Sequence, residues 1–556
     1  MTDLASMLGQ ACADAFEELG FDRKWGAVRR SDRPELADYQ CNGAMGSAKQ
    51  AGKVPRDVAG EVAAKISAHP AVASVDVAGP GFLNIRVSNA ALSEHAEFIR
   101  SDEKCGASLA PDPQVTIIDF GGPNVAKPMH VGHLRSAVIG DTLQRLLKFL
   151  GDDVTSDTHL GDWGLQMGHL VTELYDEQPD LIYFDETFTG PYPEQPPVTI
   201  DDLARLYPAA SSKAKSDEAR NERSQLAVAE LQEGRPGYRA LLKHFIDVSV
   251  AALKVDYGFL NVSFDLWKGE SDVDHLIPGV IEDFKGKNLS AEDDGAIIVD
   301  ISKEGENIPI EKDGKIRMKN AMPPIMLVNS RGGTGYHTTD LATIKDRMNM
   351  TPLPERMLYV VDARQALHFE QVYRAADKVG YIAEDKLEHI GFGTVNGTDG
   401  KPFKTREGGV LRLADLNAMA LAEAQKKIDE AGKLPEDMPA EERADVAACV
   451  ALAALRFADL QNTRTTNYVF DLDRFTSFEG KTGPYLLYAS VRIKSLLRRA
   501  KDEALAFGDI SVESDAERAL VLALDGFGHA LLQARAKRMP HILCCLLYTS
   551  PSPRDA

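Results

Sequence analysis

The period of the hydrophobic positions changes once across residues 115–150, and this change is the clearest structural signal in the chain. Val115–Phe120 is a short apolar run with β-branched residues that ends at Gly121-Gly122-Pro123, a pattern typical of a buried strand followed by a turn. From Leu134, apolar residues recur at spacings of three and four until Gly151, as expected for an amphipathic helix. The sequence therefore predicts a strand, a Gly/Pro turn and a helix in direct succession.

Four residues between the predicted strand and helix carry candidate chemistry: His130-Val131-Gly132-His133. Unpaired backbone N–H groups and the helix dipole make a helix N-terminus a favourable place for an anion. Two imidazoles separated by a glycine suit a nucleotide phosphate that must come close to the backbone. Two histidines at this spacing are also explained by helix capping or by packing, so on these residues alone both interpretations stay open.

Hydrophobic patterns elsewhere predict three further regions. Residues 1–108 contain two helical stretches and alternating runs at 72–77 and 82–87, which predict an antiparallel pair of strands in a small α+β domain. An insertion at about 176–258 contains a charged stretch, 211–233, that is predicted to be one helix. Beyond residue 413 the chain is predicted to be helical. Apolar runs between these regions predict strands at 293–299, 324–328 and 358–361.

Composition limits the class of protein. A chain of 556 residues predicts roughly three or four domains, and 44% apolar with 26% charged residues is typical of a soluble globular protein. No run of about 18 apolar residues is present, and the acidic N-terminus does not resemble a secretory signal. The six cysteines show neither metal-binding spacing nor the density of a disulfide scaffold, so we expect a reducing cytoplasm and no zinc site.

The net charge of −21 argues, taken alone, against a nucleic-acid partner. Exposed charges more than about 8 Å apart are largely screened at physiological salt, however, so local clusters decide the matter. One such cluster places five cations within the ten residues 492–501, directly after Tyr485 and Tyr488. A charge run is usually only a solvated face. Beside two tyrosines that could stack on unpaired bases, an RNA-binding face is favoured slightly over that alternative.

The segment Asn124–Ser136, which contains the two histidines, resembles the signature of class I aminoacyl-tRNA synthetases, and specifically that of arginyl-tRNA synthetases. The resemblance continues in the Gly-Asp-Trp-Gly string at 161–164, in Asp38-Tyr39-Gln40 and in the segment 477–489. It implies a multidomain α/β protein with a small N-terminal α+β domain, a Rossmann-type catalytic domain with a parallel sheet and an insertion, and an all-α C-terminal domain. The implied domains are residues 1–108, 109–412 and 413–544.

An arginine substrate makes a physical demand on its pocket, because a planar guanidinium with five donors is best met by carboxylates. The resemblance implies that carboxylates and a tyrosine bind the guanidinium, and that four other residues hold the α-amino and carboxylate ends. The first group is Glu270, Tyr336 and Asp340, and the second is Asp119, Asn124, His133 and Gln365.

The same resemblance implies an ATP site at His130, Gly132 and His133. Class I synthetases usually carry Lys-Met-Ser-Lys-Ser on a loop near residue 400, and this chain departs from that pattern. Lys401 and Lys404 are the best matches to its two lysines, and Lys127, just before the first histidine, is implied to compensate. Cations placed in advance would stabilise the charge that develops on the phosphates. The implied catalytic residues are His130, His133, Lys127 and Lys404. Mg²⁺ is expected with ATP, without a dedicated protein site.

The tRNA contacts implied by the resemblance lie at both ends of the chain. The N-terminal domain is implied to contact the tRNA elbow through Tyr39 and Gln40, and the C-terminal domain to bind the anticodon through Tyr485, Tyr488, Arg492 and Arg498. The last residues, 545–556, contain Ser-Pro-Ser-Pro, in which prolines disfavour a helix. We interpret them as a non-native tail after a truncated helical domain.

Together these observations predict an arginine–tRNA ligase that uses ATP to form arginyl-adenylate and then charges tRNA(Arg). The resemblance further implies that arginine is activated only with tRNA bound. A monomer without a membrane contact is expected. Two alternatives stay open: another nucleotidyltransferase with the same two-histidine site, and a non-catalytic tRNA-binding paralogue.

Overall fold

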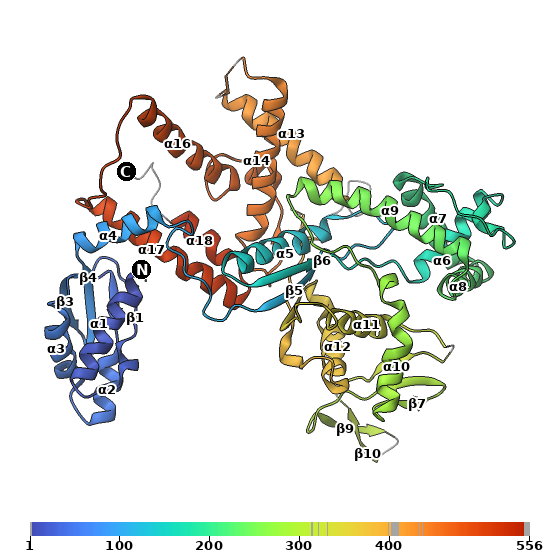
Figure 1. Ribbon diagram of the computed structural model, residues 1–556, viewed down its shortest axis with the longest axis horizontal. Helices are drawn as coiled ribbons and strands as arrows, with labels where there is room; N and C mark the ends of the chain where they lie inside the picture. The colour runs from blue at the N-terminus through green and yellow to red at the C-terminus, as the bar shows by residue number, and fades with distance from the viewer. Residues whose placement is uncertain are drawn as a thin grey trace. The chain divides into compact units, whose positions relative to one another are not determined.

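The computed structural model describes residues 3–312, 315–320, 322–330, 332–397, 400–401, 411–432, 434–435 and 437–549. The chain divides into two compact units (Figure 1). One comprises Met1–Pro111 and Tyr485–Ala556, and the other Asp112–Pro484. The helices predicted beyond residue 413 therefore fall into both units.

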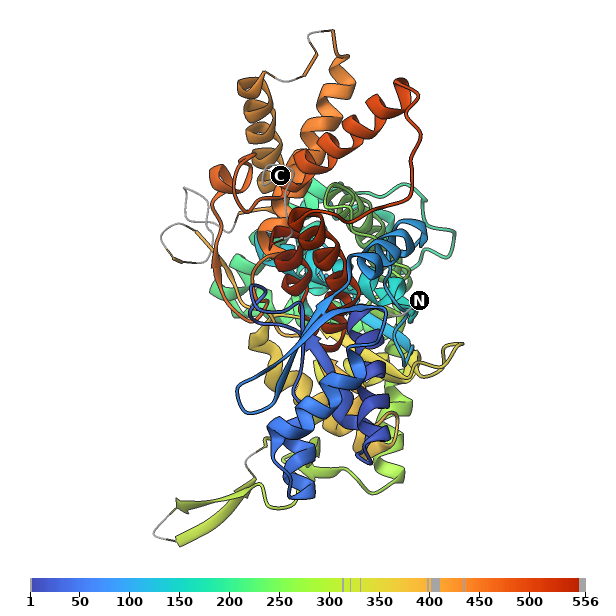
Figure 2. The same ribbon diagram turned by 90° about the vertical axis from the view of Figure 1, so that its left-hand side faces the viewer.

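The N-terminal part of the first unit is a four-stranded antiparallel sheet packed against helices, seen in blue in Figure 2. The predicted antiparallel pair at 72–77 and 82–87 is confirmed, since Val75 of one strand pairs with Ile85 of the other. The elements are α1 (Leu4–Glu18), η1 (Arg23–Gly26), β1 (Val28–Arg30), β2 (Tyr39–Cys41), α2 (Gly43–Ala51), α3 (Pro55–Ile66), β3 (Val72–Ala78), β4 (Phe82–Val87) and α4 (Asn89–Ser101).

The C-terminal helices of this unit complete the core of the N-terminal sheet. They are α16 (Gly483–Asp502), α17 (Asp515–Lys537) and α18 (His541–Thr549), and α17 packs on α4. Val512, Val521 and Leu522 join the cluster of buried apolar residues formed by α1, α3 and β4. Because α18 continues to Thr549, residues 545–549 are helical, and the expectation of a non-native tail that begins at residue 545 is not supported.

The second unit is built on a parallel sheet in the order β13-β12-β5-β6, which confirms the expected Rossmann-type architecture. The predicted strand at 115–120 is β5 (Val115–Phe120), and α5 (Val131–Phe149) follows it along the sheet (Figure 1). The other strands of the sheet are β6 (Asp153–Asp157), β12 (Arg356–Val360) and β13 (Leu387–His389). Parallel strands that are covered on both faces read as continuous apolar runs, which explains why β5 and β12 were predictable.

This unit contains further helices and short strands outside the parallel sheet. They are α6 (Leu165–Glu177), η2 (Ile182–Phe184), α7 (Ile200–Ser216), α8 (Glu218–Gln232), α9 (Pro236–Phe259), η3 (Glu270–Asp272), η4 (Asp274–Leu276), α10 (Ile277–Gly286), β7 (Ala291–Asp293), β8 (Ala296–Val299), β9 (Asn307–Lys312), β10 (Lys315–Asn320), β11 (Ile325–Val328), α11 (Tyr336–Arg347), η5 (Ala363–Gln365), α12 (Ala366–Val379), η6 (Glu384–Lys386), β14 (Val395–Asn396), α13 (Leu413–Ala431), α14 (Ala440–Leu460), β15 (Tyr468–Val469) and α15 (Leu472–Phe475).

Two local predictions were wrong. The single strand predicted at 293–299 is a hairpin, in which Asp294 and Gly295 have φ of 47° and 80° and connect β7 to β8. An Asp-Gly pair is a strong signal for such a turn because both residues tolerate positive φ. The single helix predicted at 211–233 is broken at Asp217, whose carboxylate accepts a hydrogen bond from the Arg220 N–H and caps α8.

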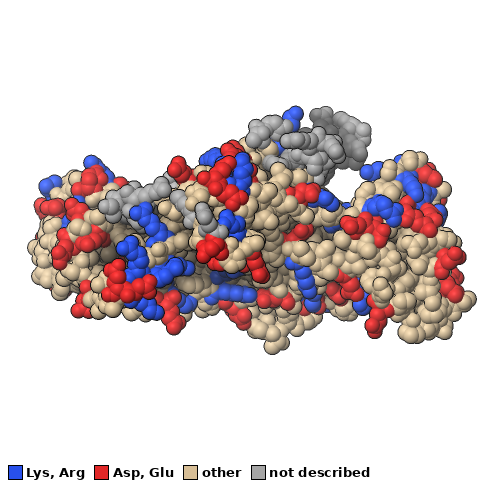
Figure 3. Space-filling model, turned by 90° about the horizontal axis from the view of Figure 1, so that it is seen from above, with Lys and Arg blue, Asp and Glu red and all other residues tan. Residues whose placement is uncertain are grey.

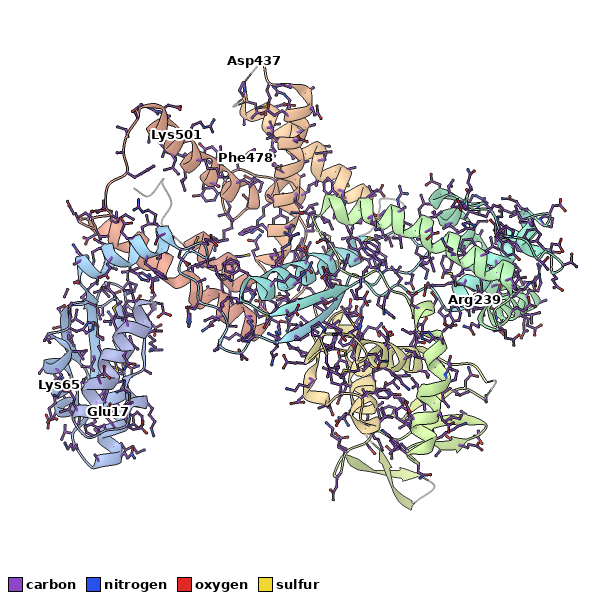
Figure 4. All side chains as sticks on the ribbon, viewed as in Figure 1. Glu17, Lys65, Arg239, Asp437, Phe478 and Lys501 are labelled. Atoms are coloured by element: carbon purple, nitrogen blue, oxygen red, sulfur yellow. The ribbon has the colours of Figure 1, made fainter. Side chains whose placement is uncertain are left out.

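The insertion contacts the Gly-Asp-Trp-Gly string at 161–164, called the second signature below, through a cation and an aromatic ring. The guanidinium of Arg239 on α9, labelled in Figure 4, lies 4.4 Å from the ring centroid of Trp163. Arg239 also pairs with Asp274 at 2.9 Å. On the face shown in Figure 3, acidic and basic side chains are interspersed over much of the visible surface. In the part of the chain that is described, no helix is long and apolar enough to cross a membrane.

Candidate active site

The two histidines of the signature cap α5. His130 is the N-cap residue, and its Nδ1 accepts a hydrogen bond from the Gly132 N–H at 3.0 Å. Nδ1 of His133 accepts one from the His130 N–H, also at 3.0 Å, and the two rings stack with centroids 4.0 Å apart. Since a neutral imidazole that accepts at Nδ1 carries its proton on Nε2, each ring can donate from Nε2 to an anion. The two histidines therefore cap the helix, and the same hydrogen bonds leave both Nε2–H groups able to donate to a phosphate.

Both imidazoles are held neutral near pH 7. Burial lowers the pKa of His133 to about 3, with the neighbouring His130 and Lys127 acting in the same direction. Burial also lowers the pKa of His130, and Arg364 and Lys127 add to this effect. The rings can therefore serve as neutral hydrogen-bond donors rather than as permanent cations. Positive charge at this site has to come from lysine or arginine side chains.

A cavity of about 140 Å³ lies beside the first histidine. Its lining residues are His130, Val131, Gly132, Arg135, Asp362, Arg364, Phe392, Gly393, Thr394 and Val395. They include the N-terminus of α5, two arginines and an aromatic ring. Such a combination suits a nucleotide, which needs partners for its phosphates and for its base.

One residue that lines this cavity, Arg135, belongs to a buried ion pair. Arg135 on α5 is 1% exposed, and its Nε pairs with the carboxylate of Asp459 on α14 at 3.0 Å. Nη1 of Arg135 donates to the carbonyl oxygens of Gly393 and Thr466, at 2.8 and 2.9 Å. The same side chain thus joins the signature helix, the cavity lining and a helix more than 300 residues away in the sequence. The sequence predicted no role for Arg135.

Lys127 lies in the signature segment, directly after Ala126, a residue with a left-handed backbone conformation. Ala126 has a φ of 64°, and its N–H donates to the Ser249 hydroxyl at 3.0 Å. The ammonium group of Lys127 lies 4.5 Å from the ring centroid of Tyr207 on α7, a cation–π contact. Lys127 also lines a second cavity of about 360 Å³ between α7, α9 and the start of α13. Lys401 is exposed, and Lys404 lies outside the described residues.

The two signatures meet at Gly161. The Val125 N–H donates to the Gly161 carbonyl at 3.0 Å, and the Gly161 N–H donates to the Pro123 carbonyl at 3.2 Å. A Cβ at Gly161 would lie 2.5 Å from Oδ1 of Asn124, so only glycine allows this approach. Asn124, a predicted arginine ligand, is thereby held against the second signature. Each signature is a short sequence motif, and backbone hydrogen bonds hold the two motifs next to each other in the structure.

Three predicted arginine ligands lie close together. The Glu270 N–H donates to the Leu160 carbonyl at 3.0 Å, which places Glu270 beside the residue that precedes the second signature. Burial, together with the nearby carboxylates of Asp162 and Asp340, raises the pKa of Glu270 to about 7. Partial desolvation of the Tyr336 hydroxyl and the charges of Glu270 and Asp340 raise the pKa of Tyr336 as well. A guanidinium placed among these groups would offset the mutual repulsion of the carboxylates.

Asp340 is held by a histidine that the sequence did not indicate as functional. Nε2 of His368 lies 2.5 Å from Oδ2 of Asp340, and both side chains are half-buried. The only signal for His368 in the sequence was its position three residues after Gln365, a predicted arginine ligand.

The two other predicted ligands on these helices are exposed. Tyr336, one helical turn before Asp340, is 68% exposed. Gln365 lies at the start of α12 and is also exposed.

Asp119, one of the four residues predicted to hold the α-amino and carboxylate ends of arginine, lies in an internal ion pair in this structure. It ends β5 with 8% of its surface exposed, and Nη2 of Arg347 bridges its Oδ2 at 2.6 Å and Oδ2 of Asp157 at 2.8 Å. Burial raises the pKa of Asp119, while Arg347 opposes that shift. The carboxylate serves an internal ion pair beneath the carboxyl edge of the sheet.

Tyr39 is likewise not available for the predicted contact with the tRNA elbow. Its ring is 1% exposed, and its hydroxyl donates to Oδ2 of Asp525 on α17 at 2.5 Å. Asp525 also accepts hydrogen bonds from the Leu4 N–H at 3.0 Å and from His95 at 2.8 Å. The neighbouring Gln40 donates to Asn84 at 2.9 Å and remains partly exposed. Tyr39 therefore joins the N-terminal sheet to α17.

The predicted anticodon-binding residues lie along α16. Tyr485 and Tyr488 are half-buried, and Arg492 and Arg498 are exposed. The spacing between Tyr485, Tyr488 and Arg492 places them on one face of the helix. Among the described residues, no group of three or more His, Cys, Asp or Glu side chains could hold a metal ion.

Three family models match the chain. The model described as the catalytic domain of class I (R) tRNA synthetases matches residues 96–472, and the arginyl-tRNA synthetase N-terminal domain matches residues 2–87. The DALR anticodon-binding domain matches residues 486–550. Because this last match reaches beyond residue 545, the expected truncation and non-native tail are not supported. The catalytic match alone covers more than half of the chain.

Comparison with individual proteins agrees with the family models. The chain is 70% identical to the arginine–tRNA ligase of Hyphomonas neptunium and 56% identical to that of Maricaulis maris; each match covers 99% of this chain and 91% of the relative. The arginyl-tRNA synthetase structure from Thermus thermophilus shares the fold, with a TM-score of 0.73 at 24% identity over 98% of this chain and 90% of that one. The structure from Plasmodium falciparum has a TM-score of 0.76 at 21% identity, covering 99% and 90%. The chain therefore belongs to the class I arginyl-tRNA synthetase family, whose members are arginine–tRNA ligases.

Proposed function

We propose that the chain charges tRNA(Arg) in two steps. The carboxylate of L-arginine attacks the α-phosphate of ATP, which forms arginyl-adenylate and releases pyrophosphate. The arginyl group then passes to the 3′ end of the tRNA, and AMP leaves. The observation that carries the proposal is the pair of neutral imidazole donors at the N-terminus of α5, beside the cavity of about 140 Å³.

In the activation step, His130 and His133 donate from Nε2 to phosphate oxygens, with the Gly132 backbone alongside. Lys127, together with Lys401 and Lys404, supplies the positive charge that the neutral rings lack. Such preorganised charge stabilises the oxygens of the transition state, and no side chain needs to act as a nucleophile. Mg²⁺ is proposed to arrive with ATP, because this ion binds readily through substrate phosphates and water.

Arginine is proposed to bind with its guanidinium among Glu270, Tyr336 and Asp340. Burial and the nearby carboxylates raise the pKa of Glu270 to about 7, and this supports the assignment, since a bound cation would offset both effects. Asn124, His133 and Gln365 are proposed to hold the α-amino and carboxylate ends. Asp119 contributes indirectly, through the Arg347 ion pair at the edge of the sheet.

We propose tRNA contacts at Gln40 in the N-terminal domain, with the basic face of α16 as the anticodon-binding element. Residues 1–108, 109–412 and 413–544 are proposed as the functional domains, in a cytoplasmic monomer. The alternatives, another two-histidine nucleotidyltransferase or a non-catalytic paralogue, are less well supported. Neither would need the arginine pocket and the intact lysine and histidine side chains together.

Exchange of pyrophosphate into ATP, measured with each of the twenty amino acids, tests this function. We expect exchange with arginine alone, and only when tRNA is present, because the family resemblance implies tRNA-dependent activation. Unfractionated tRNA freed of tRNA(Arg) serves as the control and should not support exchange. Robust exchange without any RNA would contradict the tRNA requirement, and exchange with another amino acid would contradict the substrate.

Replacing Asp340 by asparagine should weaken arginine binding. The change removes a charge from the pocket and keeps its shape, so the KM for arginine should rise about tenfold or more, as expected for a hydrogen bond to a charged group. Discrimination against citrulline, an uncharged analogue, should shrink. Asp346→Asn on the same helix, where Asp346 pairs with Lys268 at 2.5 Å, is the matched control. Unchanged selectivity between arginine and citrulline would show that Asp340 does not contribute to the selection of arginine.

A further inference from the structure

The contact between His368 and Asp340 joins two helices at the proposed arginine pocket. Asp340 lies on α11 one turn after Tyr336, and His368 lies in the first turn of α12. Because a carboxylate accepts, Nε2 of His368 must donate to Oδ2 of Asp340 across the 2.5 Å that separate them. A charge-assisted hydrogen bond this short fixes the rotation of the carboxylate.

The imidazole is itself held in place by its surroundings. The ring of His337 lies 4.8 Å from the ring of His368, measured between centroids, and Nε2 of His337 contacts Oε1 of Gln371 at 3.3 Å. Gln371 is buried and donates to the Pro323 carbonyl at 3.0 Å. A side chain that is packed on a ring and bonded at one nitrogen has few other rotamers available. His368 is therefore a fixed donor rather than a mobile one.

We propose that His368 is a positioning residue for arginine selection, which holds Oδ2 of Asp340 so that Oδ1 faces the guanidinium. The inference rests on the proposed arginine pocket and adds how that pocket is ordered. With Oδ2 occupied, Asp340 offers one oxygen to the substrate and Glu270 supplies a second carboxylate. A planar guanidinium is then bound by two separate carboxylates, an arrangement that the flat, uncharged urea group of citrulline cannot exploit equally.

Two substitutions separate the hydrogen bond from the packing. His368→Gln keeps an N–H donor near the position of Nε2, and His368→Leu removes the donor while keeping bulk. The KM and kcat for arginine come from the pyrophosphate exchange with tRNA present, and the Kd for arginine comes from calorimetry, which needs no turnover. We expect His368→Leu to raise both KM and Kd about tenfold with little change in kcat, the size expected for losing a hydrogen bond to a charged group. His368→Gln should restore both constants to near the parent values.

The same substitutions in the Asp340→Asn background test whether His368 acts through Asp340. If it does, His368→Leu should add no further rise in KM or Kd there, which a double-mutant cycle measures directly. His337→Gln is the comparison variant, because it removes the ring that packs on His368 but leaves the donor to Asp340 in place. It should raise both constants less than His368→Leu does.

Three results would overturn the inference: parent-like constants for His368→Leu, an equal rise in the Asp340→Asn background, or an equal rise for His337→Gln. A lower thermal midpoint with unchanged Kd would assign His368 to stability only, and would overturn it too. If the proposed arginine pocket itself is wrong, Asp340→Asn alone will leave arginine binding unchanged, and this result distinguishes the two failures.

Discussion

Lys127→Ala is expected to lower kcat of arginine activation by about 100- to 1,000-fold, the usual effect of removing one preorganised group that stabilises transition-state charge. The neutral state of His130 and His133 makes this loss severe, because burial holds the pKa of both rings below the ordinary value. The KM for arginine should change little, since the lysine is proposed to act on phosphate oxygens that gain charge in the transition state.

Steady-state and single-turnover exchange with tRNA present measure this effect. Lys148→Ala is the control, because Lys148 lies near the end of α5, the helix that follows Lys127 in the chain, and pairs with Asp265 at 3.0 Å. Tyr207→Leu, which removes the ring beneath the ammonium group, should give a smaller loss in the same direction. If Lys127→Ala stays within about twofold of the parent, far below the expected loss, Lys127 is only a surface cation.

Asp459→Asn is expected to lower the free energy of unfolding by about 3–5 kcal/mol, the usual cost of leaving one member of a buried ion pair without its counter-charge. Arg135 is 1% exposed and cannot recover solvation when its partner becomes neutral. Since Arg135 also donates to the Gly393 carbonyl at the wall of the nucleotide cavity, the KM for ATP should rise in the same variant.

Urea unfolding followed by circular dichroism gives the change in free energy. Asp415→Asn is the control: the Arg412–Asp415 pair is largely exposed, so its loss should cost only about 0–1 kcal/mol. The double variant Arg135→Met with Asp459→Leu should recover much of the stability, because an apolar pair needs no counter-charge. If Asp459→Asn costs no more than Asp415→Asn, Arg135 has found another partner, and the Arg135–Asp459 pair does not stabilise the cavity.

Local sequence determined much of the catalytic unit. The strand, turn and helix at 115–150 follow from residues that are neighbours in the chain, so periodicity and turn chemistry predicted β5 and α5 correctly. The hairpin of β3 and β4 was predictable for the same reason. Where local prediction failed, at the β7–β8 turn and at the break between α7 and α8, the sequence did contain the signals, an Asp-Gly pair and a capping aspartate.

Only the tertiary structure decided the partners of the polar side chains. Arg347, 228 residues away in the sequence, pairs with Asp119, and Nε2 of His368 lies 2.5 Å from Oδ2 of Asp340. Tyr39 lies in a motif typical of the family, and its role depends on Asp525, 486 residues away. The physical reason is that helices and strands follow from neighbouring residues, whereas the partner of a buried charge or hydroxyl is set by whichever distant side chain the packing of the core brings within about 3 Å.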